Sequence, residues 1–67
     1  MLESDIEITK QVEDARYGRD GARTAFIRVE FVVGKHGPFI ERFPKDGYTA
    51  DVRDDKLNAF AREVRTP

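Results

Sequence analysis

Residues able to do acid–base, nucleophilic or metal chemistry are few in this chain, and they are not grouped. His36 is the only histidine, it adjoins Lys35, and there is no cysteine to complete a metal site with it. The acidic pairs Glu13-Asp14 and Asp54-Asp55 are consecutive, so on a strand their side chains would point to opposite faces. We therefore expect no catalytic residue, no metal site, no cofactor and no small-molecule substrate, and we predict that the protein is not an enzyme.

A basic cluster with one aromatic residue is a candidate for binding. It consists of Arg16, Tyr17, Arg19 and Arg23. These residues surround a turn signal, so they would gather at the tip of a hairpin, and a projecting β-ribbon can enter a groove of nucleic acid or contact an acidic protein surface. Asp14 and Asp20 lie among the same arginines, and the net charge of the chain is -1. This balance makes nucleic acid the less favoured partner.

The elements that would position these residues are clearest in the middle of the chain. From Ala25 to Val33 apolar residues occupy every second position, which is the pattern of a strand with one buried face. The three-residue loop Lys35-His36-Gly37 is expected to close a hairpin, with its glycine in the left-handed conformation of a type I turn followed by a bulge. This register would place Glu30 opposite Arg42 on the solvent side.

The segment from Leu2 to Tyr17 permits two interpretations. Ser4-Asp5-Ile6-Glu7 matches a capping box, which predicts a helix. The Asp20-Gly21 pair is instead a hairpin signal, and a two-residue turn there would place Val12 opposite Val29. The turn and the apolar pattern agree in this second interpretation, which favours a strand and leaves the helix as the alternative.

The last third of the chain predicts one amphipathic helix. Pro44 and Gly47 mark a turn after the third strand, and Thr49, Asp51 or Asp54 can cap the helix that follows. The apolar stripe that this helix would turn toward the sheet consists of Leu57, Phe60, Ala61 and Val64.

Together these elements predict an α+β fold, a three-stranded antiparallel β-meander with one C-terminal helix packed on one face. We expect a single small domain over residues 1–67, in which residues 1–5 can remain an unpaired arm. The expected core consists of Ile8, Val12, Ile27, Val29, Phe31, Val33, Phe39, Phe43, Leu57, Phe60 and Val64. Such a core must offset the ordering of the whole chain without a disulfide or a metal, which predicts an oligomer or marginal stability.

The face of the sheet opposite the helix is not wholly polar. Among Arg28, Glu30 and Arg42 it would carry an interface patch of Phe26, Val32 and Ile40, with Tyr48 added to them. Scattered apolar residues are ordinary on protein surfaces, but several on one open face also suit a contact with another protein. The small core favours the interface, and unpaired edge strands offer a second route to a partner.

Other features limit the setting. The absence of cysteine favours a cytoplasmic protein, and no run of residues approaches the ~18 consecutive apolar positions of a membrane span. The acidic start MLESDIE lacks the basic and apolar segments of a signal peptide. We therefore expect a soluble protein with no membrane partner.

The segments FVVGKHGPF, from Phe31 to Phe39, and FPKDGY, from Phe43 to Tyr48, resemble small uncharacterised proteins encoded among the morphogenesis genes of tailed bacteriophages and prophages. The resemblance covers roughly the C-terminal half and transfers no functional residue, because the shared element is a structural turn. It implies a minor virion or assembly component that binds its neighbours, located in the cytoplasm of the bacterial host or in the virion.

The function expected from these observations is that of a non-enzymatic structural or assembly module. It would bind a protein partner or copies of itself through the exposed sheet face or an edge strand. The alternative is a small nucleic-acid-binding regulator that uses the basic tip of the first hairpin.

Overall fold

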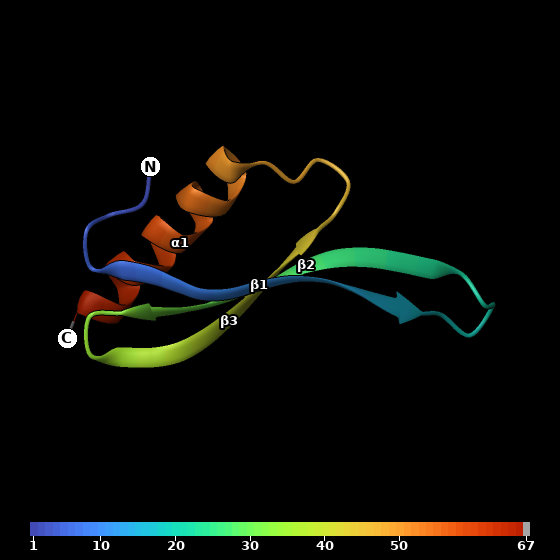
Figure 1. The fold of residues 1–67 in the computed structure, drawn as a ribbon, viewed down its shortest axis with the longest axis horizontal. Helices are drawn as coiled ribbons and strands as arrows, with labels where there is room; N and C mark the ends of the chain where they lie inside the picture. Colours follow the sequence, from blue (N-terminus) through green and yellow to red (C-terminus); the bar gives the residue numbers. More distant parts are fainter. Residues whose placement is uncertain (67) are drawn as a thin grey trace.

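The fold of the chain is known from a computed structural model that describes residues 1–66. Three strands, β1 (Ile6–Tyr17), β2 (Arg23–Val33) and β3 (His36–Pro44), precede one helix, α1 (Ala50–Arg65). The strands form one antiparallel sheet in the order β1-β2-β3, and α1 crosses one face of it (Figure 1). The expected α+β meander is confirmed, and the N-terminal segment contains a strand and not a helix.

The helix α1 is defined by its first residues and by its apolar stripe. Thr49 is the N-cap, and its Oγ1 accepts a hydrogen bond of 3.1 Å from the backbone N–H of Val52, which satisfies one of the free amides at the helix start. Leu57 and Ala61 are completely buried against the sheet, and Val64 packs at the border of the core. The predicted stripe is therefore the face that α1 buries.

The hydrophobic core lies between α1 and the sheet. Its buried members are Ile6, Val29, Phe31, Val33, Phe43, Leu57 and Ala61. Phe60 of α1 packs edge-on against Phe31 and Phe39, with ring centroids 5.4 Å and 4.8 Å apart. Val12, which we expected in this core, is not part of it.

A β-bulge at Thr9 explains the position of Val12. Ile8 lies opposite Phe31, but Lys10 lies opposite Glu30, so β1 has one extra residue there. The Thr9 Oγ1 donates a hydrogen bond of 3.1 Å to the Glu30 carbonyl. Because side chains alternate between faces, the extra residue reverses the orientation of everything that follows in β1. Ile8 therefore faces α1 as expected, whereas the prediction for Val12 was wrong.

The tip of the first hairpin has three loop residues, Arg19, Asp20 and Gly21, and not the two we expected. The Ala22 carbonyl accepts from the Gly18 N–H at 2.8 Å, and the Gly18 carbonyl accepts from the Gly21 N–H at 3.0 Å. Gly21 has φ +83°, which is the left-handed conformation of a type I turn followed by a bulge. The longer loop shifts the register by one residue.

The second hairpin has the shorter loop, and our prediction for it was also wrong. Val33 pairs with His36, so Gly34 and Lys35 form a two-residue turn, with Gly34 at φ +57°. A positive φ at the first loop residue alone is the geometry of a type II′ turn. Gly37 contributes its φ of +123° to a bulge in β3 instead.

The first residues of the chain lie against α1. The Asn58 side chain accepts a hydrogen bond from the Glu3 N–H and donates one to the Met1 carbonyl, each of 2.9 Å. Arg65 makes ion pairs with both Glu3 and Asp5. Hydrogen bonds from Arg65 hold the pKa of the Glu3 and Asp5 carboxyls below their ordinary values. These bonds tie the segment before β1 to the C-terminal half of the helix.

The molecule is elongated, with principal extents of 43 × 20 × 20 Å. The first hairpin continues well past the part of the sheet that α1 covers, and both the start of the chain and the end of α1 lie at the opposite end of the molecule (Figure 1). The far half of the β1–β2 ribbon therefore projects as an arm.

Candidate functional site

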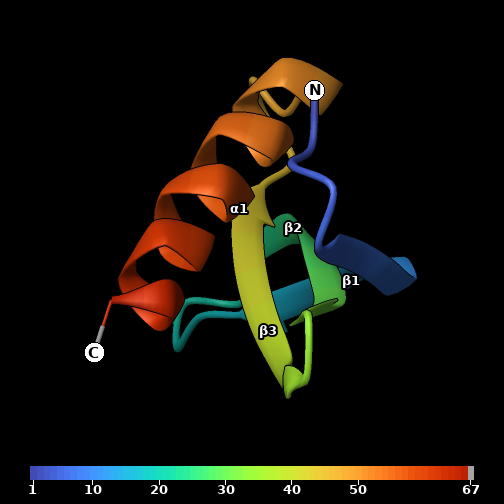
Figure 2. The same ribbon diagram turned by 90° about the vertical axis from the view of Figure 1, so that its left-hand side faces the viewer.

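One face of the sheet is covered by α1, and the other face is bare (Figure 2). Val29, Phe31 and Val33 point into the core, so the residues that alternate with them along β2 point the other way. Their cross-strand partners share this outer face. The outer face consists of Glu7, Lys10, Val12, Asp14, Arg16, Thr24, Phe26, Arg28, Glu30, Val32, Ile40, Arg42 and Pro44.

Apolar side chains recur along the outer face. Phe26 and Val32 are half-buried and Ile40 is 47% exposed, so three of the expected interface residues do share this face. Val12 joins them because of the bulge at Thr9. No signal in the hydrophobic pattern could have placed Val12 here, since Ile8 and Val12 have the same parity in the sequence.

Tyr48 is the expected interface residue that the structure places elsewhere. It packs against the hydrophobic core on the side of α1, with its ring centroid 5.5 Å from that of Phe43. Its hydroxyl donates a hydrogen bond of 3.0 Å to Gln11 Oε1. The structure therefore does not bring Tyr48 together with Phe26, Val32 and Ile40.

The outer face has an uneven distribution of charge. Arg28 lies directly opposite Arg42, and Glu30 lies opposite Ile40, so the expected pairing of Glu30 with Arg42 was wrong. The nearest carboxylate to this arginine pair is that of Asp14, 3.9 Å from Arg28 Nη1. Arg28 Nε is buried and has no hydrogen-bond acceptor among residues 1–66. Guanidinium donors thus outnumber acceptors in this part of the face.

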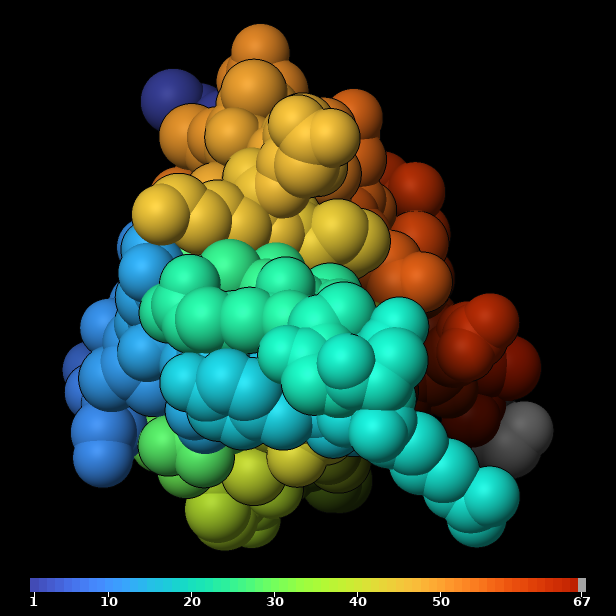
Figure 3. All heavy atoms as spheres, turned by 90° about the vertical axis from the view of Figure 1, so that its right-hand side faces the viewer, coloured from blue at the N-terminus to red at the C-terminus, as the bar shows by residue number. Residues whose placement is uncertain are grey.

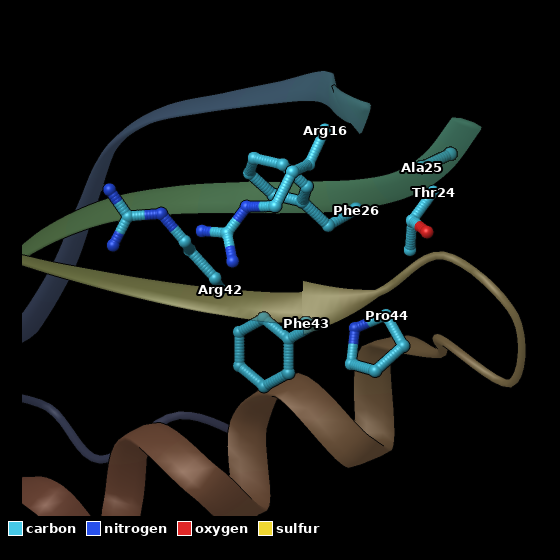
Figure 4. A pocket seen from close by; sticks show the side chains of 7 residues that line it. All are labelled: Arg16, Thr24, Ala25, Phe26, Arg42, Phe43 and Pro44. Carbon is cyan, nitrogen blue, oxygen red and sulfur yellow. The ribbon is translucent and has the colours of Figure 1, made fainter. Parts of the chain in front are cut away.

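A hollow opens on the outer face where Arg16 and Arg42 meet. It has a volume of about 310 Å³, and Phe26 and Pro44 are among the apolar residues that line it. Figure 4 shows that Arg16, from β1, and Arg42, from β3, both extend over β2, with the Phe26 ring beside Arg16. We call the site formed by Arg16, Phe26, Arg42 and Pro44 the arginine hollow. Sequence reasoning assigned Arg16 to the hairpin tip and did not connect it with Arg42.

The basic cluster at the hairpin tip does not form one surface. Tyr17 is 69% exposed and lies opposite Arg23, whereas Arg16 points to the other face and Arg19 lies in the loop. Figure 3 looks along the molecule onto this tip, which projects toward the viewer. Asp20 Oδ1 accepts a hydrogen bond of 3.0 Å from the Ala22 N–H, so this carboxylate stabilises the turn.

The other candidate groups are dispersed. His36 is exposed at the first position of β3, and among residues 1–66 no three side chains of the metal-ligating kinds are placed to hold an ion. Glu13 forms an ion pair of 2.8 Å with Lys45, which lowers the pKa of the Glu13 carboxyl. Asp54 is buried; burial alone would raise its pKa, but the hydrogen bond of 2.9 Å from Arg53 and the nearby amino terminus lower it overall.

The two edge strands are less open to a partner than the face. β1 carries the bulge at Thr9, and β3 has a bulge at Gly37 and prolines at Pro38 and Pro44. Bulges and prolines interrupt the row of free backbone groups that an added strand needs. The outer face is therefore the better candidate for an interaction surface.

Within the described residues, no helix has the length and apolar character needed to cross a membrane. Comparisons of the chain with protein-family models, with curated proteins and with solved structures find no match.

Proposed function

We propose that the protein is a non-enzymatic assembly module that binds copies of itself, or a neighbouring protein, through the outer face. The observation that carries this proposal is the bare face itself, which presents Val12, Phe26, Val32 and Ile40 to solvent on the side that α1 leaves uncovered. A chain of this size buries only about 60% of its unfolded surface, so it gains stability by covering such a face.

The resemblance of the C-terminal half to small proteins of phage morphogenesis regions supports an assembly role. We propose on that basis a minor virion or assembly component of a tailed phage, which would act in the bacterial cytoplasm or remain in the virion.

Light scattering on the purified chain tests the proposal. We expect the mass to rise with concentration, and the double substitution Val32→Lys with Ile40→Lys to give a monomer, because two charges would have to be buried in the contact. Far-ultraviolet circular dichroism should remain unchanged, since both residues lie outside the core. Tyr17→Lys is the control, because Tyr17 is 69% exposed but pairs with Arg23 and does not lie on the outer face.

The result that contradicts self-assembly is a monomer at every concentration whose melting temperature does not respond to the double substitution. In that case the outer face would bind a different protein and not copies of this chain.

Nucleic-acid binding through the hairpin tip is the second candidate. The projection of the tip and the 69% exposure of Tyr17 favour it, but the four side chains are divided between two faces and a loop. Salt-dependent affinity for DNA or RNA that disappears in Arg19→Glu with Arg23→Glu would support this candidate. No binding at low salt would exclude it.

A further inference from the structure

The arginine hollow carries two positive charges that no carboxylate of the described residues pairs with. Among residues 1–66, neither Arg16 nor Arg42 forms an ion pair. Asp14 is the nearest acidic residue of the outer face, and one of its oxygens already accepts the Ala15 N–H at 2.8 Å. The guanidinium groups therefore have free donors that point into solvent above an apolar wall.

Arg42 of the hollow also lies opposite a third arginine, Arg28, and this pairing lowers the stability of the sheet. Like charges directly opposite each other on neighbouring strands are destabilising, and Arg28 and Arg42 are such a pair. Arg28 Nε is in addition buried without an acceptor. Asp14, 3.9 Å from Arg28 Nη1, offsets this repulsion only on the Arg28 side, since Arg42 forms no ion pair among residues 1–66. A local feature that weakens the isolated chain is expected at a functional site.

The start of α1 presents the complementary features. Asp51 and Asp55 are exposed and one turn apart, so they lie on the same side of the helix, and neither forms an ion pair among residues 1–66. Val52 lies beside them and is 47% exposed. One apolar side chain beside two carboxylates is the chemistry that the arginine hollow would accept, because its two guanidinium groups lie next to apolar side chains.

We infer that the arginine hollow of one molecule receives the start of α1 from a second copy of this chain. Arg16 and Arg42 donate hydrogen bonds to the Asp51 and Asp55 carboxylates of the second copy, and its Val52 packs against Phe26 and Pro44. This assignment rests on the proposed function and names the part of the molecule that the outer face binds.

The two surfaces meet at the β3 edge of the molecule, where Arg42 and Pro44 line a second hollow together with Val52 and Asp55 of α1. A single contact of this kind leaves one free hollow and one free helix start. Because both surfaces lie near one edge, two copies can satisfy both contacts around a two-fold axis, or further copies can extend the assembly.

A protein segment suits the hollow better than nucleic acid. Asp14, Glu30 and Glu7 share the outer face with the arginines, and a phosphate backbone that followed the face would meet these carboxylates. Affinity for a phosphate backbone comes from many charge contacts, and a protein with strongly salt-dependent binding makes about 6–10 of them. The hollow offers two arginines.

Mixing of two neutralised variants tests the inference. Arg16→Gln with Arg42→Gln leaves the helix start intact, and Asp51→Asn with Asp55→Asn leaves the hollow intact. In analytical ultracentrifugation we expect each variant alone to be monomeric, with a dissociation constant raised roughly tenfold or more. The equimolar mixture should form a dimer of one copy of each and nothing larger, because only one functional pair of surfaces remains.

Arg19→Gln with Arg23→Gln is the matched control, since it removes the same charge from the hairpin tip without touching the hollow. It should assemble like the unmodified chain. Circular dichroism of all three variants checks that α1 is intact.

Assembly that persists in both neutralised variants overturns the inference, and so does a mixture that forms no dimer. Equal loss of assembly in the control also overturns it, because net charge would then explain the effect. A labelled oligothymidine that binds the hollow and displaces the second copy would assign the site to nucleic acid.

The outcomes also separate this inference from the proposed function. If Val32→Lys with Ile40→Lys abolishes assembly but the neutralised variants retain it, the inference fails and the outer face remains the interface. If the unmodified chain does not assemble at any concentration, self-assembly as the proposed function fails as well.

Discussion

Arg28 of β2 and Arg42 of β3 lie directly opposite one another on the outer face, and no carboxylate separates them. We expect Arg42→Thr to stabilise the isolated monomer by about 0.5 kcal/mol, because it removes a like-charge pair and adds a residue with a high strand propensity. Urea denaturation at concentrations that keep the chain monomeric measures the difference. Arg19→Thr, in the hairpin loop, should leave the free energy of unfolding unchanged. A less stable Arg42→Thr monomer would show that the pair is not repulsive.

The bulge at Thr9 predicts opposite outcomes at two positions of β1. Ile8→Lys should lower the free energy of unfolding by about 1.5–3 kcal/mol, because Ile8 packs against the core. Val12→Lys, on the outer face, should change it by no more than about 0.5 kcal/mol. Thermal unfolding of the two variants measures both changes in the free energy of unfolding. Equal effects would mean that β1 runs without a bulge, so that both side chains point to the same face.

Phe60 is expected to be a major contributor to the contact of α1 with the sheet. Phe60→Ala should cost about 3 kcal/mol, since the ring packs edge-on against both Phe31 and Phe39. For a domain of this size such a loss approaches global unfolding. Val52→Ala, at an exposed position of the same helix, serves as the control in the melts. A loss below about 1 kcal/mol would show that α1 does not depend on these aromatic contacts.

The acidic residues next to Arg65 predict a pH dependence of stability. The pKa of the Glu3 and Asp5 carboxyls is lowered in the folded chain, chiefly by hydrogen bonds from Arg65. Their contribution is therefore complete above the unfolded pKa values of about 4 and is lost as the pH falls through the lower folded values. Arg65→Gln should be less stable than the unmodified chain at pH 7, and the two melting temperatures should converge as the pH falls through the lowered pKa values of Glu3 and Asp5. If the melting temperatures of the two chains differ by the same amount at every pH, the ion pairs of Arg65 do not cause the pH dependence of stability.

Most of the fold follows from the sequence because the apolar pattern is redundant. Alternation in β2 and the stripe at Leu57 and Ala61 each identify one buried face, and these two faces must meet. The register of the second hairpin was predicted wrongly by two residues. A shift of two keeps Phe39 and Phe43 on the core side, so burial alone cannot distinguish the two alignments.

The error in the first hairpin had a different cause and affected the candidate site. A bulge is a local irregularity that the apolar pattern does not report, and the one at Thr9 moves Val12 from the core to the outer face. The arginine hollow was missed for a related reason. Arg16 and Arg42 are far apart in the chain, and only the register of both hairpins together brings them to one place. Phe26, Val32 and Ile40 were found because all three belong to the regular part of the alternation.

The ion pair between Arg65 and Asp5 joins positions that are 60 residues apart. A ribosome releases the N-terminal part of a chain first, so both hairpins are made before the helix that covers Val29 and Phe31 exists. During that interval the sheet has two bare faces, and its apolar side is open to any other nascent chain. Synthesis of the last third of the chain is thus the step that covers the apolar side of the first two thirds.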